Sequence, residues 1–398
     1  MLKIAVMGHG VVGSGVAEVF YQNKKSIENK AGEQLDIKYI LDLRDFEGLP
    51  YSDKFIKDFN IILNDSEVKI VVEVMGGITF AYEYVKKCLM AGKSVVSSNK
   101  ELVAEHGAEL LNIAFDNNVN FLFEASVGGG IPILRPLSQC LAANEITEIS
   151  GILNGTTNFI LNKMINDGAD FKDALDLAQS LGYAEKDPTA DVEGHDACRK
   201  ICILASLAFG SHVYPKSVYT EGITKITAED VIYADMAGYA IKLIGKCKKL
   251  DSGKIFATVY PCFVPKENML SHVNGVMNAV LVTGNAVGET MFYGPGAGKY
   301  PTASAVIADI VDCAKHINKR KYLDWNECSG DFVVDHLDEK VKMYIRTMES
   351  KEKIKHAFPS AKILASNTTT AFITDEMVER DVISKIKNLK VLSSIRLL

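Results

Sequence analysis

The sequence lacks the features that mark several large classes of protein. No apolar run approaches the roughly 18 residues of a membrane span, and the longest, at 201–210, is far shorter. The 44 Lys and Arg are outnumbered by 50 Asp and Glu, so no basic surplus favours nucleic acid. The eight cysteines include no CxxC pair, and the helical spacing of Cys198 and Cys202 indicates packing rather than zinc binding. We therefore expect no membrane span and no nucleic-acid partner.

What the chain does have is the composition of a folded enzyme. Its 398 residues exceed what one hydrophobic core usually holds, so we expect two or three domains. Apolar residues make up 47% and charged residues 24%, which excludes a disordered chain. The N-terminus, MLKIAVMG, leads into a strand pattern and lacks a signal peptide's charged start and cleavage site. These features predict a cytoplasmic protein.

The first 130 residues alternate short apolar runs with longer amphipathic ones, which is the pattern of βαβ units around a parallel sheet. The predicted fold class is α/β, with a Rossmann-type doubly wound parallel sheet followed by an α+β catalytic and dimerisation domain. We expect the dinucleotide-binding domain at 1–132, with a helix at 301–318 packing back onto it, and the substrate-binding and dimerisation domain at 133–300. The strands are expected at 3–7, 37–41, 70–74, 94–97 and 120–123, and in the second domain at 145–153, 255–263 and 276–282.

The C-terminal region has an order of its own, after a fall in apolar density at 326–331 that we interpret as a linker. Strand, helix, two strands, helix and strand are expected between 341 and 397, which is the βαββαβ order of a split βαβ sandwich. From Val341 onward, 11 Lys and Arg face 6 Asp and Glu, whereas the rest of the chain is acidic. We therefore expect a separate module at 331–398.

A glycine-rich turn near the N-terminus predicts nucleotide binding. Gly8, Gly10 and Gly13 form a GxGxxG motif between a predicted strand and a predicted helix. Glycine permits the tight turn and lets the backbone approach a pyrophosphate, whose charge lies at the helix N-terminus. The motif alone is weak evidence, but this context and the βα units that follow it predict a bound dinucleotide.

The end of the second predicted strand bears on the choice between NAD and NADP. Asp42 and Arg44 lie where the adenosine ribose would bind, about 30 residues past Gly13 rather than the usual 20 or so. An acidic side chain there favours the 2′-hydroxyl of NAD, and an arginine accommodates the 2′-phosphate of NADP. Guanidinium–phosphate pairing is strong, so we lean to NADP. Both residues could equally be ordinary loop charges.

Three further stretches carry charges whose roles the residues alone leave open. Lys100 follows the fourth predicted strand, on the ligand-binding side of open parallel sheets, but could be a solvated surface charge. The acidic loop at 182–191, taken alone, is typical of an exposed connector with helix-capping aspartates. Asp196 and Lys200 have the spacing of a solvent-facing helical ion pair. Their helix continues into an apolar run, however, where such a lysine could pass a proton to a developing alkoxide.

Taken together, these motifs resemble those of the homoserine dehydrogenases. The similarity runs in the family's order through GHGVVG (8–13), VVEVMGG (71–77), SSNK (97–100), EASVGGGIPI (124–133), GILNGTTNFI (151–160), GYAEKDPTADVEGHDACRK (182–200) and GPGAGKYPTASAVIAD (294–309). The resemblance implies NAD(P)-dependent, reversible reduction of L-aspartate 4-semialdehyde to L-homoserine, in the biosynthesis of threonine, methionine and isoleucine.

The resemblance also implies roles for individual residues. Lys200 matches the family's proton donor and Lys100 its nucleotide-side lysine, and we place Asp196 with them in the catalytic group. The positions matching substrate contacts or the pocket lining are Glu185, Asp196, Asp191 and Thr156. The expected cofactor-binding residues are Gly8, Gly10, Val11, Val12, Gly13, Arg44, Gly76, Lys100, Gly182 and Gly298.

Two further expectations come from the family. A monovalent cation such as sodium would be bound by Glu124 and by the carbonyls of Val127, Gly129 and Ile131, although Glu124 could equally be a satisfied strand-end carboxylate. A homodimer would form on the second domain's sheet, because the apolar strands at 145–153 and 276–282 would otherwise leave an exposed edge.

The C-terminal module resembles ACT-type regulatory domains but departs from them at one turn. Those domains usually carry an Asp-x-Pro-Gly turn after the first strand, where an amino-acid effector binds. Residues 347–351 here contain neither proline nor glycine. We therefore expect an altered or lost effector site and a role in dimer packing.

Two rival functions remain open from the sequence. One is another NAD(P)-dependent amino-acid or semialdehyde dehydrogenase, and the other is a non-catalytic NAD(P) sensor. The presence of both lysines and of the acidic side chains disfavours a sensor, because sensing requires no proton donor.

Overall fold

The structure is a computed structural model that describes residues 1–321, 323, 325–328, 331–366 and 368–398. The predicted linker at 326–331 thus includes two residues, 329 and 330, that lie outside the described part. The chain forms two compact units. Unit 1 comprises Met1–Glu145, Cys202–Pro215 and Gly294–Ser329, and unit 2 comprises Ile146–Ile201, Lys216–Tyr293 and Gly330–Leu398.

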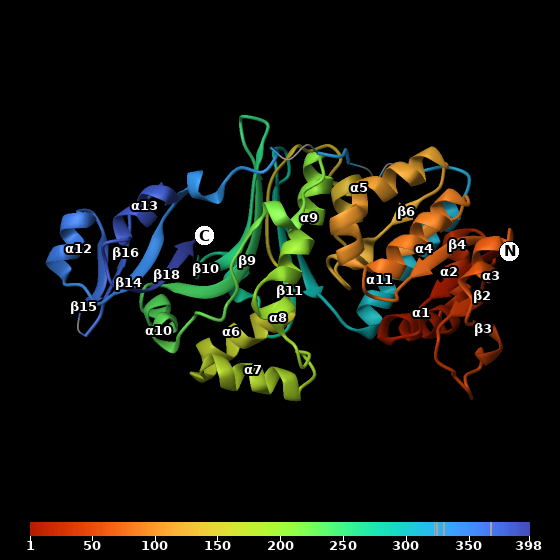
Figure 1. Ribbon diagram of the computed structural model, residues 1–398, viewed down its shortest axis with the longest axis horizontal. Helices are drawn as coiled ribbons and strands as arrows, with labels where there is room; N and C mark the ends of the chain where they lie inside the picture. Colours follow the sequence, from red (N-terminus) through yellow and green to blue (C-terminus); the bar gives the residue numbers. More distant parts are fainter. Residues whose placement is uncertain (322, 324, 329–330, 367) are drawn as a thin grey trace. The chain divides into compact units, whose positions relative to one another are not determined.

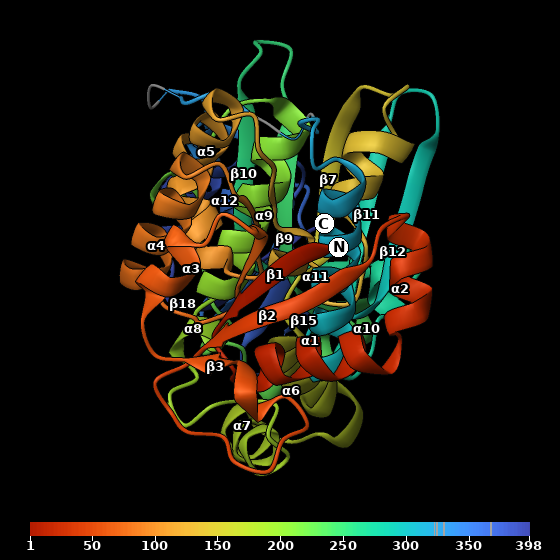
Figure 2. The ribbon, with the colours of Figure 1, turned by 90° about the vertical axis from the view of Figure 1, so that its right-hand side faces the viewer.

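Unit 1 is built on a parallel sheet whose described strands have the order β3-β2-β1-β4-β5-β6. This order is that of dinucleotide-binding doubly wound folds, in which ligands bind at the carboxyl ends of the strands. Figure 2 shows β1 and β2 side by side. The strands are β1 (Leu2–Met7), β2 (Leu35–Leu41), β3 (Phe55–Ile56), β4 (Val68–Glu73), β5 (Ser94–Ser97) and β6 (Phe121–Leu122). The expected Rossmann-type sheet is confirmed, and only the two-residue β3 was not foreseen.

Helices cover this sheet, and one of them comes from late in the chain. Helix α11 packs on α1 so closely that a Cβ on Gly15 would lie 2.9 Å from the carbonyl oxygen of Lys299. Lys299 also pairs with Glu18 of α1 at 2.7 Å. The helices of unit 1 are α1 (Val11–Gln22), α2 (Lys24–Ala31), α3 (Phe59–Asn64), α4 (Thr79–Met90), α5 (Lys100–Asp116) and α11 (Lys299–Lys315).

Unit 2 is built on a mixed sheet. Its described strands follow one another in the order β12-β11-β7-β9-β10-β18-β14-β16-β15, with β8 beside β10. The strands outside the C-terminal module are β7 (Ile146–Ile152), β8 (Tyr219–Thr220), β9 (Tyr239–Lys249), β10 (Ile255–Pro265), β11 (Met277–Gly284) and β12 (Gly288–Pro295). The helices of this part are α6 (Gly155–Asp167), α7 (Phe171–Ser180), α8 (Thr189–Val192), α9 (His195–Phe209, whose first seven residues belong to unit 2) and α10 (Ala228–Met236).

The expectation that the strands at 145–153 and 276–282 form exposed edges is wrong. Strand β7 lies between β11 and β9, and β11 lies between β12 and β7. The free edge at this end of the described sheet belongs to β12, half of whose residues are exposed and which was not foreseen as a strand.

The C-terminal residues have the expected βαββαβ order and extend the same sheet (Figure 1, blue). Its C-terminal strand β18 pairs in parallel with β10 through Cys262↔Arg396 and Phe263↔Leu397. The elements are β14 (Met343–Thr347), α12 (Lys351–Ala357), β15 (Lys362–Ser366), β16 (Thr370–Ile373), α13 (Glu379–Ile386) and β18 (Val391–Leu397), with a small ribbon of β13 (Lys340–Val341) and β17 (Met377–Val378).

Two buried arginines join this module to the rest of unit 2. Arg396 of β18 pairs with Glu379 at 2.5 Å and with Glu221 at 2.8 Å. Arg346 of β14 pairs with Glu229 and, at 3.0 Å, with Asp230, both in the first turn of α10. Buried ion pairs of this kind are costly to break from one side, so the module is an integral part of the unit.

Candidate active site

The turn between β1 and α1 has the geometry of a phosphate-binding loop. Gly8 has a φ of +101°, which favours glycine. A Cβ on Gly13 would lie 2.0 Å from the carbonyl oxygen of Gly8, whereas a Cβ on Gly10 would meet nothing within 4 Å. No side chain caps α1 and its first turn carries no acid. The amides of this helix start, where Val11 and Val12 lie, thus suit a pyrophosphate.

The predicted ribose side of the nucleotide site is organised by Asp42. Its carboxylate accepts the backbone N–H of His9 at 2.8 Å and a bidentate pair from Arg44 at 3.0 Å. The Arg44 side chain holds the pKa of the Asp42 carboxyl well below its usual range. Arg44 itself is 62% exposed, and its guanidinium also contacts the Phe46 ring. Asp42 therefore fixes the glycine turn, while Arg44 presents a cation to solvent.

A second cation lies at the same edge of the sheet. Lys57 follows β3 and pairs with Asp45 at 2.7 Å, one residue after Arg44. Sequence reasoning missed Lys57 because β3 is too short to reveal that it pairs with the end of β2. Burial among aromatic rings, including those of Phe46 and Phe55, lowers the pKa of nearby His9.

The four remaining predicted cofactor residues lie at four different element ends. Gly76 follows β4 with a φ of +79°, and Lys100 is the first residue of α5. Gly298 precedes α11 with a φ of +119°. These three lie in unit 1 with the glycine turn, whereas Gly182 lies in unit 2, in an exposed turn after α7 with a φ of +75°.

The predicted catalytic pair in unit 2 is buried, not solvent-facing. Lys200 Nζ lies 2.8 Å from Asp196 Oδ2, with 9% and 5% of the two side chains exposed. The same ammonium donates to the carbonyl oxygen of Leu153 at 2.8 Å. Low exposure strengthens each of these contacts, because little water screens them.

Asn154 connects this pair to the acidic loop. Its amide nitrogen donates to Asp196 Oδ2 at 2.9 Å and to Asp191 Oδ1 at 2.7 Å. Its amide oxygen accepts the N–H of Thr157 and so caps α6. One side chain thus fixes the start of a helix and holds two carboxylates near one lysine. Sequence reasoning missed Asn154, although an asparagine before a helix is the signal of an N-cap.

The other predicted substrate residues lie around the same loop. Thr156 is buried in the first turn of α6 and donates to the carbonyl oxygen of Tyr183 at 2.6 Å. Glu185 has an exposed side chain, and its backbone carbonyl accepts from Gln179 at 2.9 Å. The structure thus places Asp191, Asp196, Lys200 and Thr156 in one framework and leaves Glu185 at its solvent side.

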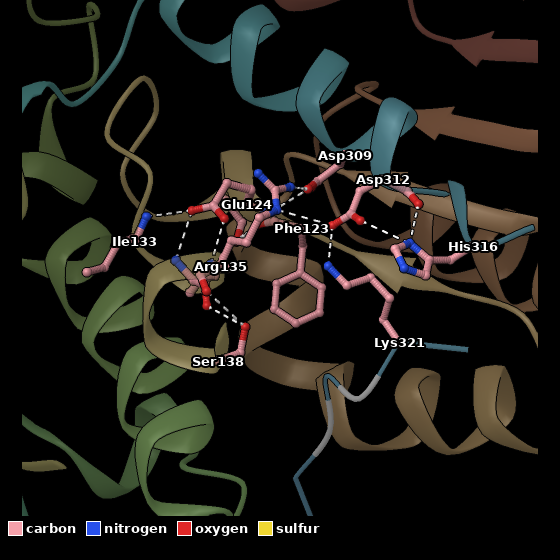
Figure 3. A network of polar contacts seen from close by, with 11 residues as sticks. Phe123, Glu124, Ile133, Arg135, Ser138, Asp309, Asp312, His316 and Lys321 are labelled. Carbon is pink, nitrogen blue, oxygen red and sulfur yellow. Dashed lines mark hydrogen bonds and ion pairs between the residues drawn. The ribbon is translucent and has the colours of Figure 1, made fainter. Parts of the chain in front are cut away.

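The carboxylate of Glu124 is bound by backbone N–H groups. Its two carboxylate oxygens accept the N–H groups of Ile133, Leu134 and Arg135 at 2.6, 2.8 and 2.8 Å (Figure 3). Asp309 accepts the backbone N–H of Glu124 at 2.8 Å, and burial together with the Glu124 charge raises the pKa of Asp309 to about 8. Arg135 pairs with Asp309 and, like Lys321, with Asp312.

The turn that carries the predicted carbonyl ligands is tightly fixed. Gly129 has a φ of +56°, and a Cβ there would lie 2.3 Å from the carbonyl oxygen of Gly296. The N–H of Gly130 donates to the carbonyl of Pro295, and that of Ile131 to the carbonyl of Gly128. Among the described residues, no group of three or more His, Cys, Asp or Glu could hold a metal ion.

The described helices include none that is long and apolar enough to cross a membrane.

The fold and the glycine turn are those of a nucleotide-dependent dehydrogenase with a second, α+β unit. Residues 8–124 match the model of the NAD-binding domain of homoserine dehydrogenase, and residues 132–311 match that of homoserine dehydrogenase itself. The chain belongs to the homoserine dehydrogenase family. It is therefore an NAD(P)-dependent oxidoreductase that acts on a CH–OH group, and its reaction is the reversible reduction of L-aspartate 4-semialdehyde to L-homoserine.

Individual relatives agree over most of the chain. The homoserine dehydrogenase of Neisseria gonorrhoeae is 45% identical over 316 residues, 79% of this chain and 72% of that protein. That of Bacillus subtilis is 43% identical, over 79% of this chain and 73% of that protein. A crystal structure of the enzyme from Thiobacillus denitrificans matches with a TM-score of 0.92 and 36% identity, covering 100% of this chain and 98% of that one. A hyperthermophilic archaeal homoserine dehydrogenase in complex with NADPH matches over 78% of this chain and 97% of that chain, with a TM-score of 0.66 and 29% identity.

Proposed function

We propose that Lys200 is the acid that protonates the aldehyde oxygen during reduction and accepts the hydroxyl proton of homoserine during oxidation. The observation that carries this role is the buried ammonium held between Asp196 and the carbonyl of Leu153. These two contacts fix the direction of the amine, as a general acid requires. The nicotinamide, when bound, supplies the hydride that reaches the carbonyl carbon.

The acidic framework suits the other end of the substrate. Homoserine and aspartate 4-semialdehyde both carry an ammonium group, which carboxylates bind. Asp191 is held by Asn154, and Glu185 lies at the solvent side of the same loop. In this proposal these two carboxylates bind the ammonium, Thr156 lines the pocket, and Asp196 orients Lys200.

In the proposed nucleotide site, backbone amides would bind the pyrophosphate and cationic side chains would bind near the ribose. The uncapped start of α1 would hold the pyrophosphate, with Gly10 leaving room for it. Arg44 and Lys57 supply two cations near the adenosine ribose, which favours the 2′-phosphate of NADP over the hydroxyl of NAD. In this proposal the other glycines and the Val11–Val12 turn complete the cofactor site, and Lys100 is the nucleotide-side lysine of the catalytic group. An Arg44→Ala variant should lose affinity for NADP and keep its affinity for NAD, measured by nucleotide fluorescence.

A monovalent cation such as sodium is also part of the proposal. Hard oxygen ligands suit such an ion, and the carbonyls of Val127, Gly129 and Ile131 belong to a rigid turn. The carboxylate of Glu124 already accepts three N–H groups, so its part would be its charge and its backbone. Activity measured in sodium, potassium and a bulky organic cation tests this site.

We infer a homodimer that covers the free edge of β12. An exposed edge strand is a template for pairing with another chain, and a second copy would satisfy it. Light scattering should give about twice the mass of one chain, and a single species near 43.5 kDa would contradict the dimer.

The buried cysteines Cys88, Cys247 and Cys262 are free thiols, which fits a reducing, cytoplasmic location.

The C-terminal module is proposed to be structural, with threonine a poor inhibitor. The turn after β14 contains Met348 and Glu349 instead of glycine, and the carbonyl of Glu349 accepts the hydroxyl of Thr370. Side chains therefore occupy the place where an ACT-type effector would meet bare backbone. Removing residues 331–398 should reduce stability or dimerisation more than it changes regulation. Half-inhibition by sub-millimolar threonine that is lost on truncation would contradict this.

Absorbance at 340 nm with homoserine and NADP tests the activity directly. Turnover should require both compounds. In the reverse direction, aspartate 4-semialdehyde should be reduced with oxidation of NADPH. Nucleotide binding without turnover would instead favour the sensor.

A further inference from the structure

A buried carboxylate, Glu73, lies at the nucleotide end of the parallel sheet and has no place in the mechanism above. It is the last residue of β4 and is 0% exposed. Strand β4 lies between β1 and β5, so Glu73 is in register with Met7 on one side and with Ser97 on the other. It therefore lies at the carboxyl end of the strands where this fold binds its ligand.

Both oxygens of Glu73 bind loops that follow the strands. Oε1 accepts the N–H of Met75 at 2.9 Å, which fixes the turn leading to Gly76. Oε2 accepts the hydroxyl of Ser97 at 2.6 Å. Burial raises the pKa of Glu73, and these donors oppose that rise.

Ser97 extends this linkage to the helix that begins with Lys100. Its hydroxyl oxygen accepts the N–H of Asn99 at 3.0 Å while its proton goes to Glu73. Asn99 then donates to the carbonyl of Gly77 at 2.6 Å and caps α5 by accepting the N–H of Leu102. The chain of contacts thus closes on itself, from Glu73 through Ser97 and Asn99 back to the turn after β4.

We propose that Glu73 is a positioning residue that fixes the turn at 74–77 and the start of α5 relative to each other. The turn at 74–77 lies beside the glycine loop, since a Cβ on Gly8 would be 2.8 Å from the carbonyl oxygen of Val74. The start of α5 carries Lys100. Glu73 thereby sets the distance between the nucleotide-binding backbone and Lys100, and the inference rests on the proposed role of that lysine.

The test compares the two serines that begin and end β5. Ser94 and Ser97 are 2% and 0% exposed; the Ser94 hydroxyl accepts the N–H of Asn120 at 3.2 Å, and the Ser97 hydroxyl donates to Glu73 and accepts from Asn99. Glu73→Gln and Ser97→Ala should each lower kcat by about 10²-fold, the effect of a small displacement of reacting groups. Ser94→Ala, at the far end of the strand, should keep the wild-type kcat with a similar change in melting temperature.

Three further readouts separate positioning from folding and from the proposed function. The double variant of Glu73 and Ser97 should lose no more activity than either single variant, since both break one linkage. The Kd of NADP and the KM of homoserine should change little, so that the loss lies in kcat. Lys100→Met should lose activity if its proposed role is right. If Lys100→Met is inactive while a folded Glu73→Gln or Ser97→Ala keeps wild-type kcat, the inference about Glu73 is overturned, and an equal kcat loss in Ser94→Ala would overturn it too.

Discussion

Two lysine–aspartate pairs in unit 2 have the same spacing of four residues along a helix and the same nitrogen–oxygen distance, but they differ in burial and in their surroundings. On α6, Lys163 Nζ lies 2.8 Å from Asp167, with 32% and 51% of the side chains exposed. On α9, Lys200 Nζ also lies 2.8 Å from Asp196, with 9% and 5% exposed. Distance and spacing thus do not distinguish a surface pair from a buried one.

The difference lies in what surrounds each pair. Lys163 contacts its aspartate and the face of the Phe159 ring, both on the same helix. Lys200 and Asp196 are bound in addition by Leu153 and Asn154, which come from a segment more than 40 residues earlier. A screened surface pair contributes a few tenths of a kcal/mol. A buried pair that loses one member leaves an uncompensated charge and costs about 3–5 kcal/mol.

The largest effect should come from removing the two lysines in turn. Lys200→Ala should lower kcat by about 10²–10⁴-fold, because a positioned general acid is lost, and should leave nucleotide binding nearly unchanged. Lys163→Ala should keep wild-type turnover. The 340 nm assay together with nucleotide fluorescence measures both quantities, and equal effects of the two variants would remove the distinction between the pairs.

The aspartates should differ in stability. Asp196→Asn leaves the Lys200 ammonium buried without its counter-charge and should lower the free energy of unfolding by about 3–5 kcal/mol. Asp167→Asn should change it by less than about 0.5 kcal/mol. Urea unfolding of the two variants gives the comparison. A change below about 1 kcal/mol for Asp196→Asn would show that water compensates the Lys200 ammonium for its lost counter-charge.

Asn154 has two structural roles, because it caps α6 and also holds the two carboxylates. Asn154→Ala should cost about 1–2 kcal/mol of stability through the lost cap, and should raise the KM of homoserine. Asp170→Ala removes the N-cap of α7, whose side chain accepts the N–H of Asp173, and so serves as the matched control. It should cost similar stability without changing KM. A KM of homoserine that stays at the wild-type value in Asn154→Ala would show that Asn154 acts only as a helix cap.

The smallest effect is expected at the exposed end of the acidic loop. Glu185→Gln keeps the shape and removes the charge, so the KM of homoserine should rise by about two- to fivefold, as exposed charge pairs are weak. The KM of NADP should stay the same. If the KM of homoserine is also unchanged, the loop around Glu185 is an ordinary connector.

Local patterns predicted the parts of this molecule that local interactions determine. The strand–glycine–helix turn at Gly8–Gly13 and the βαββαβ order of the C-terminal residues follow from periodicity and glycine placement. Strand β9 was missed because lysines interrupt its apolar run. One of them, Lys242, is buried, with its ammonium bound by Asn158 and the carbonyl of Val273, and burial lowers its pKa to about 8.

Contacts between distant segments could not be read in this way. The spacing of Asp196 and Lys200 placed them on one face of a helix but gave no sign of Leu153 and Asn154, which bury them. The free edge was expected on the wrong strands because the pairing of β12 with β11 depends on the whole sheet. Glu124 was left between a cation ligand and a satisfied carboxylate, and only the three N–H groups facing it show how its oxygens are used.

Chemical rescue of a Lys200→Ala variant tests whether the buried Lys200 is the proton donor. Small primary amines added to Lys200→Ala should restore turnover of aspartate 4-semialdehyde in proportion to the concentration of the protonated amine, and should leave Lys163→Ala and the wild-type enzyme unaffected. A Lys200→Ala enzyme that keeps more than about a tenth of wild-type turnover at neutral pH without any amine would contradict the claim, because a lost general acid costs at least about 10²-fold.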